Sequence, residues 1–206
     1  MFEESGERIS VDGDGNPWVV RKDGKILKYN DLDQKFDEIV GRARDISIGA
    51  TGDIYAIGWQ RTKKGYPVQK WNGKSWTPTS GYGFRVAVDQ KGSPWVVTRR
   101  HKVFRLDGKK WKRVRGSLDD IAIGPEGSII GVRKRFGVWK YNLTKSKWYK
   151  IGRWAASVAV GPGGRPFITT SKGTIFWAEP ECPDTFTPIS RRRPAKNVKS
   201  DSGYDF

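Results

Sequence analysis

The stretch from Ile9 to Gly41 reads ISVDGDGNPWVVRKDGKILKYNDLDQKFDEIVG, and variants of it follow one another along most of the 206-residue chain. A fixed period between about 20 and 50 residues is typical of folds built from stacked units. One turn glycine per unit marks the period, with spacings of 37, 40, 35 and 37 residues between Gly15, Gly52, Gly92, Gly127 and Gly164. We therefore predict five repeats, numbered one to five, at about 7–41, 42–81, 82–116, 117–152 and 153–190.

Each repeat predicts four short β-strands. In repeat one, Ile9–Val11 alternates apolar, small and apolar residues, as a half-buried strand does, and the turn glycine follows. Pro17–Val20 and Ile26–Tyr29 supply the second and third strands. The fourth strand starts on an aromatic residue in every repeat, namely Phe36, Trp76, Trp111, Trp148 and Phe186.

This pattern indicates an all-β fold, a β-propeller of about five four-stranded blades, for which a five-bladed ring is the simplest closure. So small a sheet cannot bury its faces alone, so the blades must stack on one another. We expect most of the recurring aromatic side chains to form the core between blades. A single propeller domain is expected over residues 1–190, followed by a basic and polar tail over 191–206.

The repeats resemble the tectonin family. The best matches are ISIGATGDIYAI at Ile46–Ile57 and VQKWNGKSW at Val68–Trp76. Two features depart from the pattern: Ile130 stands where other repeats carry an aromatic residue, and repeat five ends in WAEPECPDTF. Members of this family form β-propellers and include lectins for bacterial lipopolysaccharide or glycan and intracellular scaffold modules. The resemblance implies a binding module and leaves its ligand open.

The chain is strongly basic, with 39 Lys and Arg against 22 Asp and Glu, a net charge of +17. Loops alternate between the two faces of a propeller, so hairpins between second and third strands share one face with the links between repeats. We call this the basic face, because most cations fall there, and expect it to attract an acidic partner. The residues predicted to bind an anionic partner are Arg21, Lys22, Arg61, Lys63, Lys64, Arg99, Arg100, Lys102, Arg133, Lys134, Arg135, Arg191, Arg192 and Arg193.

One loop of the basic face is longer than its equivalents. In repeat two, the segment between the second and third strands contains WQRTKKGY, Trp59 to Tyr66, and length variation in a single loop is typical of a binding surface. Exposed aromatic rings beside basic loops can stack on sugar rings. The candidates for such stacking are Trp59, Tyr66, Tyr82 and Trp154.

The sequence predicts no enzyme, no cofactor and no metal site. His101 is the only histidine and lies in a basic hairpin, while Cys182 has no metal-ligand neighbours. Asp12-Gly13-Asp14 reads as a turn, and Gly161–Gly164 lacks the Lys-Ser/Thr of a phosphate loop. With no signal-like start and no run of eighteen apolar residues, we expect an intracellular protein, cytoplasmic or cytoskeletal.

Three functions are compatible with these observations. The first is a non-catalytic scaffold module that docks its basic face onto an acidic protein surface or assembly, of which a microtubule-type lattice is one example. The second is a lectin that binds glycan or lipopolysaccharide. The third is nucleic-acid binding, suggested by basic and aromatic residues interleaved in RRHKVFRLDGKKWKRVRG, Arg99 to Gly116. This interleaving also follows from the blade period, so nucleic acid ranks third.

Overall fold

The structure, a computed structural model, describes residues 5–179 and 186–189, and there every regular element except one short 3-10 turn, Pro162–Gly164, is a β-strand. The all-β prediction is confirmed. The largest sheet has seven strands: β1 (Arg8–Val11), β2 (Pro17–Val20), β3 (Lys25–Asn30), β4 (Lys35–Ile48), β5 (Ile54–Gly58), β6 (Tyr66–Trp71) and β7 (Trp76–Gly83).

Three further sheets have four antiparallel strands each. The first holds β8 (Arg85–Val88), β9 (Pro94–Val97), β10 (Lys102–Asp107) and β11 (Lys110–Ser117). The second holds β12 (Asp120–Ile123), β13 (Ile129–Arg133), β14 (Gly137–Asn142) and β15 (Lys147–Gly152). The third holds β16 (Ser157–Val160), β17 (Pro166–Thr169), β18 (Ile175–Trp177) and β19 (Thr187–Pro188).

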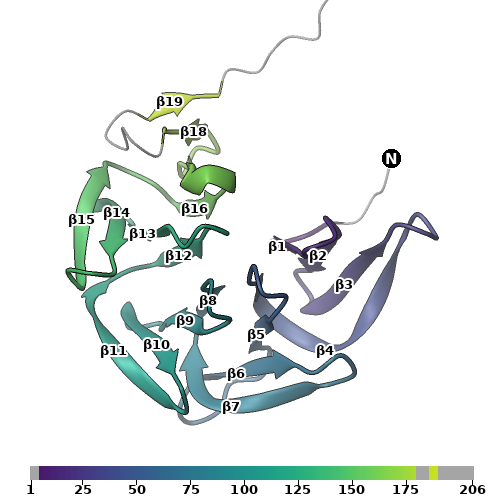
Figure 1. Cartoon of the computed structure of the whole chain (residues 1–206). Coiled ribbons are helices and arrows are strands. Elements are labelled where there is room, and N and C mark those ends of the chain that lie inside the picture. The colour runs from purple at the N-terminus through teal and green to yellow at the C-terminus, as the bar shows by residue number, and fades with distance from the viewer. Residues whose placement is uncertain (1–4, 180–185, 190–206) are drawn as a thin grey trace, which may run out of the picture.

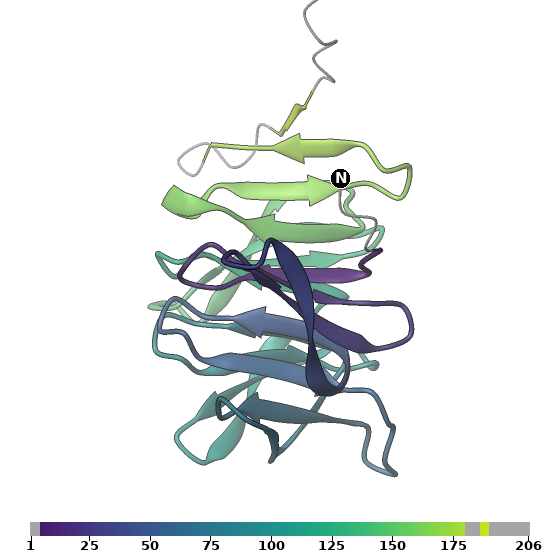
Figure 2. The same cartoon turned by 90° about the vertical axis from the view of Figure 1, so that its right-hand side faces the viewer.

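The sheets are arranged in an arc around a common centre, with β8, β12 and β16 near the centre and β11 and β15 outside (Figure 1). The arc is open, because β16–β19 and β1–β3 lie on either side of a gap rather than against each other (Figure 1). A closed five-bladed ring is therefore not formed by the described residues. Figure 2 shows the turns gathered at two opposite edges of the molecule, which are the two faces of the arc.

Strand β4 differs from the sequence prediction. The pattern predicts a fourth strand for repeat one and a separate first strand for repeat two, whereas the structure has one strand of 14 residues. Its first part pairs with β3 up to Arg42, and its second part pairs with β5 from Ala43. Gly41 has φ 98° at the crossing point, a conformation that glycine adopts without the Cβ clash of other residues. The chain thus changes partner within one continuous strand, at a glycine with positive φ.

The core consists of four clusters of buried apolar side chains, and each joins two consecutive repeats. In the first, Trp18, Val20 and Ile26 of repeat one pack with Ile46 and Ala56 of repeat two. Repeats two and three, three and four, and four and five are joined in the same way. Burial thus occurs between sheets, as expected for stacked units whose faces are apolar on both sides.

A glycine–aromatic contact recurs at these interfaces. The aromatic residue that starts the fourth strand packs on the glycine that ends the preceding repeat, so Trp76 lies on Gly41, Trp111 on Gly81, Trp148 on Gly116 and Phe186 on Gly152. A Cβ on Gly116 would lie 2.7 Å from the Trp148 ring, and one on Gly41 would lie 2.9 Å from the Trp76 ring. Only glycine leaves room for the ring at this distance. The prediction that the recurring aromatic residues are core is confirmed here for Trp76, Trp111 and Trp148.

Gly81→Ala should destabilise the protein by about 1–3 kcal/mol, because the new methyl group overlaps the Trp111 ring and forces the two sheets apart. The φ of Gly81 lies outside the left-handed region, so the loss tests packing and not backbone strain. Gly13→Ala is the matched control, since a Cβ there meets no atom within 4 Å. Urea unfolding measures both variants, and equal stabilities would contradict the proposed role of the contact.

Candidate binding face

The structure places the predicted cationic hairpins and the links between repeats at the same end of the strands. Links are hydrogen-bonded to the preceding hairpin: the Ala43 N–H donates to the Gly24 carbonyl at 2.9 Å, and the Leu118 N–H donates to the His101 carbonyl at 3.0 Å. Among the predicted binding residues, those with exposed side chains are Lys22, Arg61, Lys63, Lys64, Arg99, Arg100, Lys102, Lys134 and Arg135. Arg191, Arg192 and Arg193 lie outside the described residues.

Arg133 differs from the other predicted binding residues, because its charge is used within the protein. Its Nη1 donates to both carboxylate oxygens of Asp119, at 2.9 and 2.8 Å. The same carboxylate accepts the Lys134 N–H at 2.7 Å and lies 2.9 Å from Nδ1 of His101. Asp119 therefore ties the hairpin of repeat three to that of repeat four. Arg21 is also ion-paired, with Asp23 at 3.8 Å.

The pKa of Asp119 reflects this cluster. Burial alone would raise the pKa of its carboxyl group, but the hydrogen bonds from Arg133 and from the Lys134 N–H, with the nearby charges of Arg133 and His101, lower it below the ordinary value. His101 itself adopts φ 61°, at the position where repeats one and five have Gly24 and Gly173. The left-handed conformation is costly for a residue with a side chain, and His101 holds it while its ring contacts Asp119.

Three grooves occupy equivalent places on the basic face. Each lies between consecutive repeats and is bordered by the link and by the third-strand residue at one equivalent position: Gln69, Trp139 or Phe176. We name them by the repeats they separate. The 1–2 groove has a volume of about 570 Å³, the 3–4 groove about 430 Å³ and the 4–5 groove about 860 Å³.

The 4–5 groove combines charge with an exposed aromatic ring. Lys134 and Arg135 line one side and Lys172 the other, so cations from two hairpins converge on it. Trp154, in the link between β15 and β16, is 74% exposed and forms part of its wall, while Phe176 contributes a second ring. An open groove with flanking cations and accessible rings fits a ligand that carries both negative charge and apolar surface.

Of the four aromatic residues predicted to stack on sugars, Trp154 alone has an exposed side chain. Tyr66 is 7% exposed, which corrects its predicted exposure: the Arg44 guanidinium lies 4.4 Å from the centre of its ring and 4.6 Å from that of Trp59. Trp59 also packs against Gly24, and Tyr82 is half-buried beside Gly65. The long loop of repeat two therefore uses its flanking rings for packing.

An ion cluster that was not predicted from the sequence lies at the centre of the arc. The Arg8 side chain reaches Asp45 at 2.7 Å and Asp120 at 3.3 Å, and Arg85 lies 3.6 Å from Asp120. Each carboxylate also accepts a backbone N–H of the following repeat, from Val86 and Val158. The sequence does contain a pattern that points to this cluster. The residue directly before the first strand's opening apolar residue is Arg or Asp in turn in the first four repeats: Arg8, Asp45, Arg85 and Asp120, followed by Ser157 in repeat five.

The pKa values of the charged groups in this cluster depend on burial and on the opposite charges beside them. Although burial alone would lower the pKa of the Arg8 guanidinium, the charges and hydrogen bonds of Asp45 and Asp120 raise it, so Arg8 stays charged. Burial raises the pKa of Asp120, against the opposing charges of Arg8 and Arg85. Asp45 and Asp120 are both buried, so these two carboxylates do not offset the charge of the exposed cations on the basic face.

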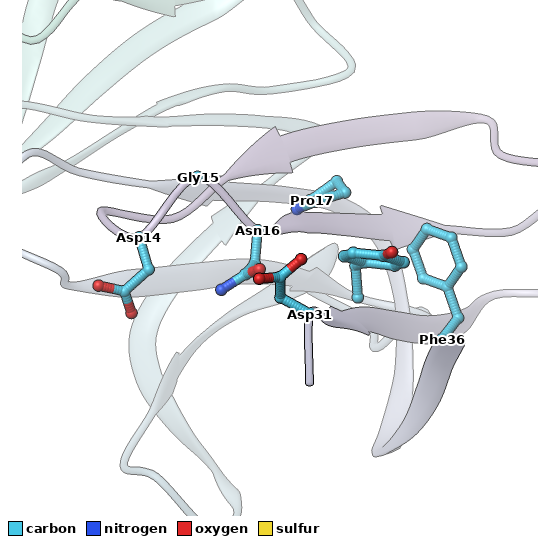
Figure 3. A pocket seen from close by; sticks show the side chains of 7 residues that line it. Asp14, Gly15, Asn16, Pro17, Asp31 and Phe36 are labelled. Atoms are coloured by element: carbon cyan, nitrogen blue, oxygen red, sulfur yellow. The ribbon is translucent and has the colours of Figure 1, made fainter. Parts of the chain in front are cut away.

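The opposite face carries a pocket that is lined by acidic and not by basic side chains. It is lined by Asp14, Gly15, Asn16, Pro17, Tyr29, Asp31 and Phe36. Figure 3 shows Asn16 and Asp31 close together, with Phe36 toward the other end. Its volume is about 510 Å³, and two carboxylates but no cation line it. No site was predicted here, and the two carboxylates of the pocket do not suit an acidic ligand.

The turn predictions can also be assessed. The Asp12 carboxylate accepts the N–H groups of Asp14 and Asn16 and the Trp18 indole N–H, which confirms a turn. The Gly163 and Gly164 N–H groups donate to Glu126 of the preceding repeat. No group of three or more His, Cys, Asp or Glu residues within 5–179 and 186–189 has the geometry to hold a metal ion. No helix in the described part of the chain is long and apolar enough to cross a membrane.

Comparison with known proteins supports the fold. No protein-family model matches the sequence. Tectonin-1 of Physarum polycephalum is 29% identical over 52 residues, which cover 25% of this chain and 24% of that protein. The chain thus matches about a quarter of that relative's length, and the resemblance to tectonins is limited to this segment.

Two solved structures are similar over most of the chain. YCF48 bound to D1 peptide superposes with a TM-score of 0.58 at 14% identity, covering 87% of this chain and 64% of that one. YCF48 from Cyanidioschyzon merolae gives a TM-score of 0.57 at 14% identity, covering 88% of this chain and 70% of that one. The chain is a β-propeller in architecture. It spans less than two thirds of the YCF48 chain in the peptide complex.

Asp119→Asn should lower the free energy of unfolding by about 1–3 kcal/mol at about pH 5, because Arg133 loses its charged partner. The pKa of Asp119 is lower in the folded than in the unfolded chain, so its ionised form stabilises the fold above about pH 4. That contribution is lost as the pH falls through the folded-state pKa. The difference between parent and variant should therefore shrink between about pH 5 and pH 2.

Urea unfolding across this pH range measures the effect. Glu38→Gln serves as the control, since the Lys25–Glu38 pair is exposed and its loss should change stability by about 0.5 kcal/mol or less. A difference for Asp119→Asn that stays constant with pH would show that its ionisation does not stabilise the fold.

Proposed function

We propose that this protein is a non-catalytic binding module that docks its basic face onto an acidic protein surface, as a scaffold component of a larger intracellular assembly. The observation that carries the proposal is the convergence of Lys134, Arg135 and Lys172 on the groove beside exposed Trp154. Like charges held together repel one another, and an anionic partner relieves that repulsion. YCF48 bound to D1 peptide supplies a propeller of similar fold with a peptide partner, which favours a protein ligand here as well.

We also infer that the arc comprises five blades. The seven-stranded sheet then contains two blades joined through β4, and each four-stranded sheet is one. Support comes from the four apolar clusters, each of which joins one pair of consecutive repeats. On this count, the grooves recur at blade boundaries, so the repeat that builds the arc also generates its binding positions.

A glycan-binding function is the second candidate. Trp154 favours it, because an exposed indole ring in an open groove offers a flat apolar surface for a sugar, and the neighbouring cations suit acidic glycan or lipid phosphate. The part-length resemblance to Tectonin-1 is compatible with this function. Nucleic acid remains third, since Trp111, within the basic stretch that suggested it, packs on Gly81.

The triple variant Lys134→Glu, Arg135→Glu and Lys172→Glu should weaken binding to a short fluorescent polyglutamate peptide by at least about tenfold, because the groove becomes acidic. Binding by the parent should also weaken as salt is raised. Fluorescence anisotropy measures both effects.

The matched control reverses three exposed cations of the opposite face, Lys74, Lys110 and Lys145, and thus makes the same change in net charge. Equal loss in both triple variants would show that net charge and not the groove attracts the peptide. A parent that binds a glycan array and ignores polyglutamate would replace the first proposal with the second.

A further inference from the structure

The hairpin between β13 and β14 is the shared wall of two grooves. Arg133 and Phe136 line the 3–4 groove, while Lys134 and Arg135 line the 4–5 groove. Successive side chains of one short turn are thus divided between neighbouring sites. A ligand that crosses this turn can contact both grooves at once.

Each groove presents one strongly exposed aromatic ring. Phe136 is 60% exposed in the 3–4 groove, and Trp154 is 74% exposed in the 4–5 groove. The equivalents of Phe136 are Gly24, His101 and Gly173, so repeat four alone among these hairpins has a large apolar side chain there. Exposed apolar side chains do not make a protein more soluble, so their exposure points to a contact with a partner. Aromatic residues are also enriched among the side chains that dominate binding energy.

The hairpin is also held in place. Arg133 is fixed by its bidentate bond to Asp119, which also accepts the Lys134 N–H. Arg135 adopts φ 66°, and the Phe136 N–H donates to the Arg133 carbonyl at 2.9 Å. A wall fixed before binding loses little conformational entropy when a ligand is bound.

We propose that the ligand is an acidic peptide segment with two apolar anchors, which lies across the 133–137 hairpin and places one anchor in each groove. This inference rests on the proposed function and specifies its ligand. The 3–4 groove is bordered by apolar Leu118, Trp139 and Trp148, which suit an aromatic or branched aliphatic anchor. Lys134 and Arg135 lie on the hairpin between the anchors and pair with the acidic residues of the segment.

Charge and anchors have separable roles in this arrangement. The cations attract acidic segments in general and set the salt dependence, whereas the two grooves select segments with apolar residues at the right separation. A segment with acidic residues alone binds weakly, and one with a single anchor binds with intermediate affinity.

The test uses three fluorescent probes on the full chain: polyglutamate, the same peptide with one Phe, and the same peptide with two Phe at a series of separations. The two-Phe peptide of best separation should bind about a hundredfold more tightly than polyglutamate, about tenfold for each anchor. Phe136→Ala and Trp154→Ala should each remove about tenfold of that gain, measured as the ratio of two-Phe to polyglutamate affinity in the same variant. Tyr149→Ala is the control, because Tyr149 is partly exposed on β15 and lines neither groove.

The outcomes distinguish this inference from the proposed function. Polyglutamate binding that depends on Lys134, Arg135 and Lys172, with no gain from added Phe, would overturn the two-anchor ligand and leave the acidic-partner function standing. A gain that survives in both Phe136→Ala and Trp154→Ala would also overturn it. Binding of none of the peptides would reject the proposed function itself. Thermal unfolding of the variants, each altered at an exposed side chain, confirms that the fold is intact.

Discussion

The packing of one aromatic ring on one glycine, repeated at each junction, is the contact on which this structure depends. A four-stranded sheet has too little area to fold by itself, so each repeat is stable only against its neighbours. The glycine that ends one repeat gives the next a flat backbone surface, and the ring that starts the fourth strand covers it. The indole Nε1 atoms of Trp111 and Trp148 have no hydrogen-bond partner among the described residues. Ring packing is thus maintained despite the cost of burying these donors.

The basic face is a consequence of the same repeat. Because each unit places its second hairpin and its link at one end of the strands, the charged residues at these positions all lie on one side of the arc. The charges nevertheless differ in what they do. Arg44 contacts the rings of Trp59 and Tyr66, and Arg133 is bound to Asp119, whereas Lys134, Arg135 and Lys172 remain exposed around the 4–5 groove. Those already paired within the protein hold the loops in position, and the exposed ones carry the proposed contact with a partner.

Ion pairing also acts at the centre of the arc. Arg8 of repeat one reaches Asp120 of repeat four as well as its neighbour Asp45, so it connects units far apart in the chain. A buried carboxylate is costly unless it is paired, and both carboxylates here also accept a backbone N–H from the next repeat. These directional bonds set the offset between neighbouring inner strands along the strand axis. Apolar packing alone does not set this offset, because it has no preferred direction.

By itself the sequence determined the all-β class and the position of most strands and turns, because alternation and turn glycines are local properties that do not depend on distant contacts. It also placed the cations on one face, since hairpin order fixes which loops share a face. Only the tertiary structure decided that β4 runs through two units, that the arc is open, and that Tyr66 is buried while Trp154 is exposed. The pairing of Arg133 and Arg8 was also decided by the tertiary structure: the alternation of Arg and Asp along the repeats marks the Arg8 position, but folding determines which charges meet. Burial and pairing depend on how units stack, and the residue pattern within one unit does not encode that geometry.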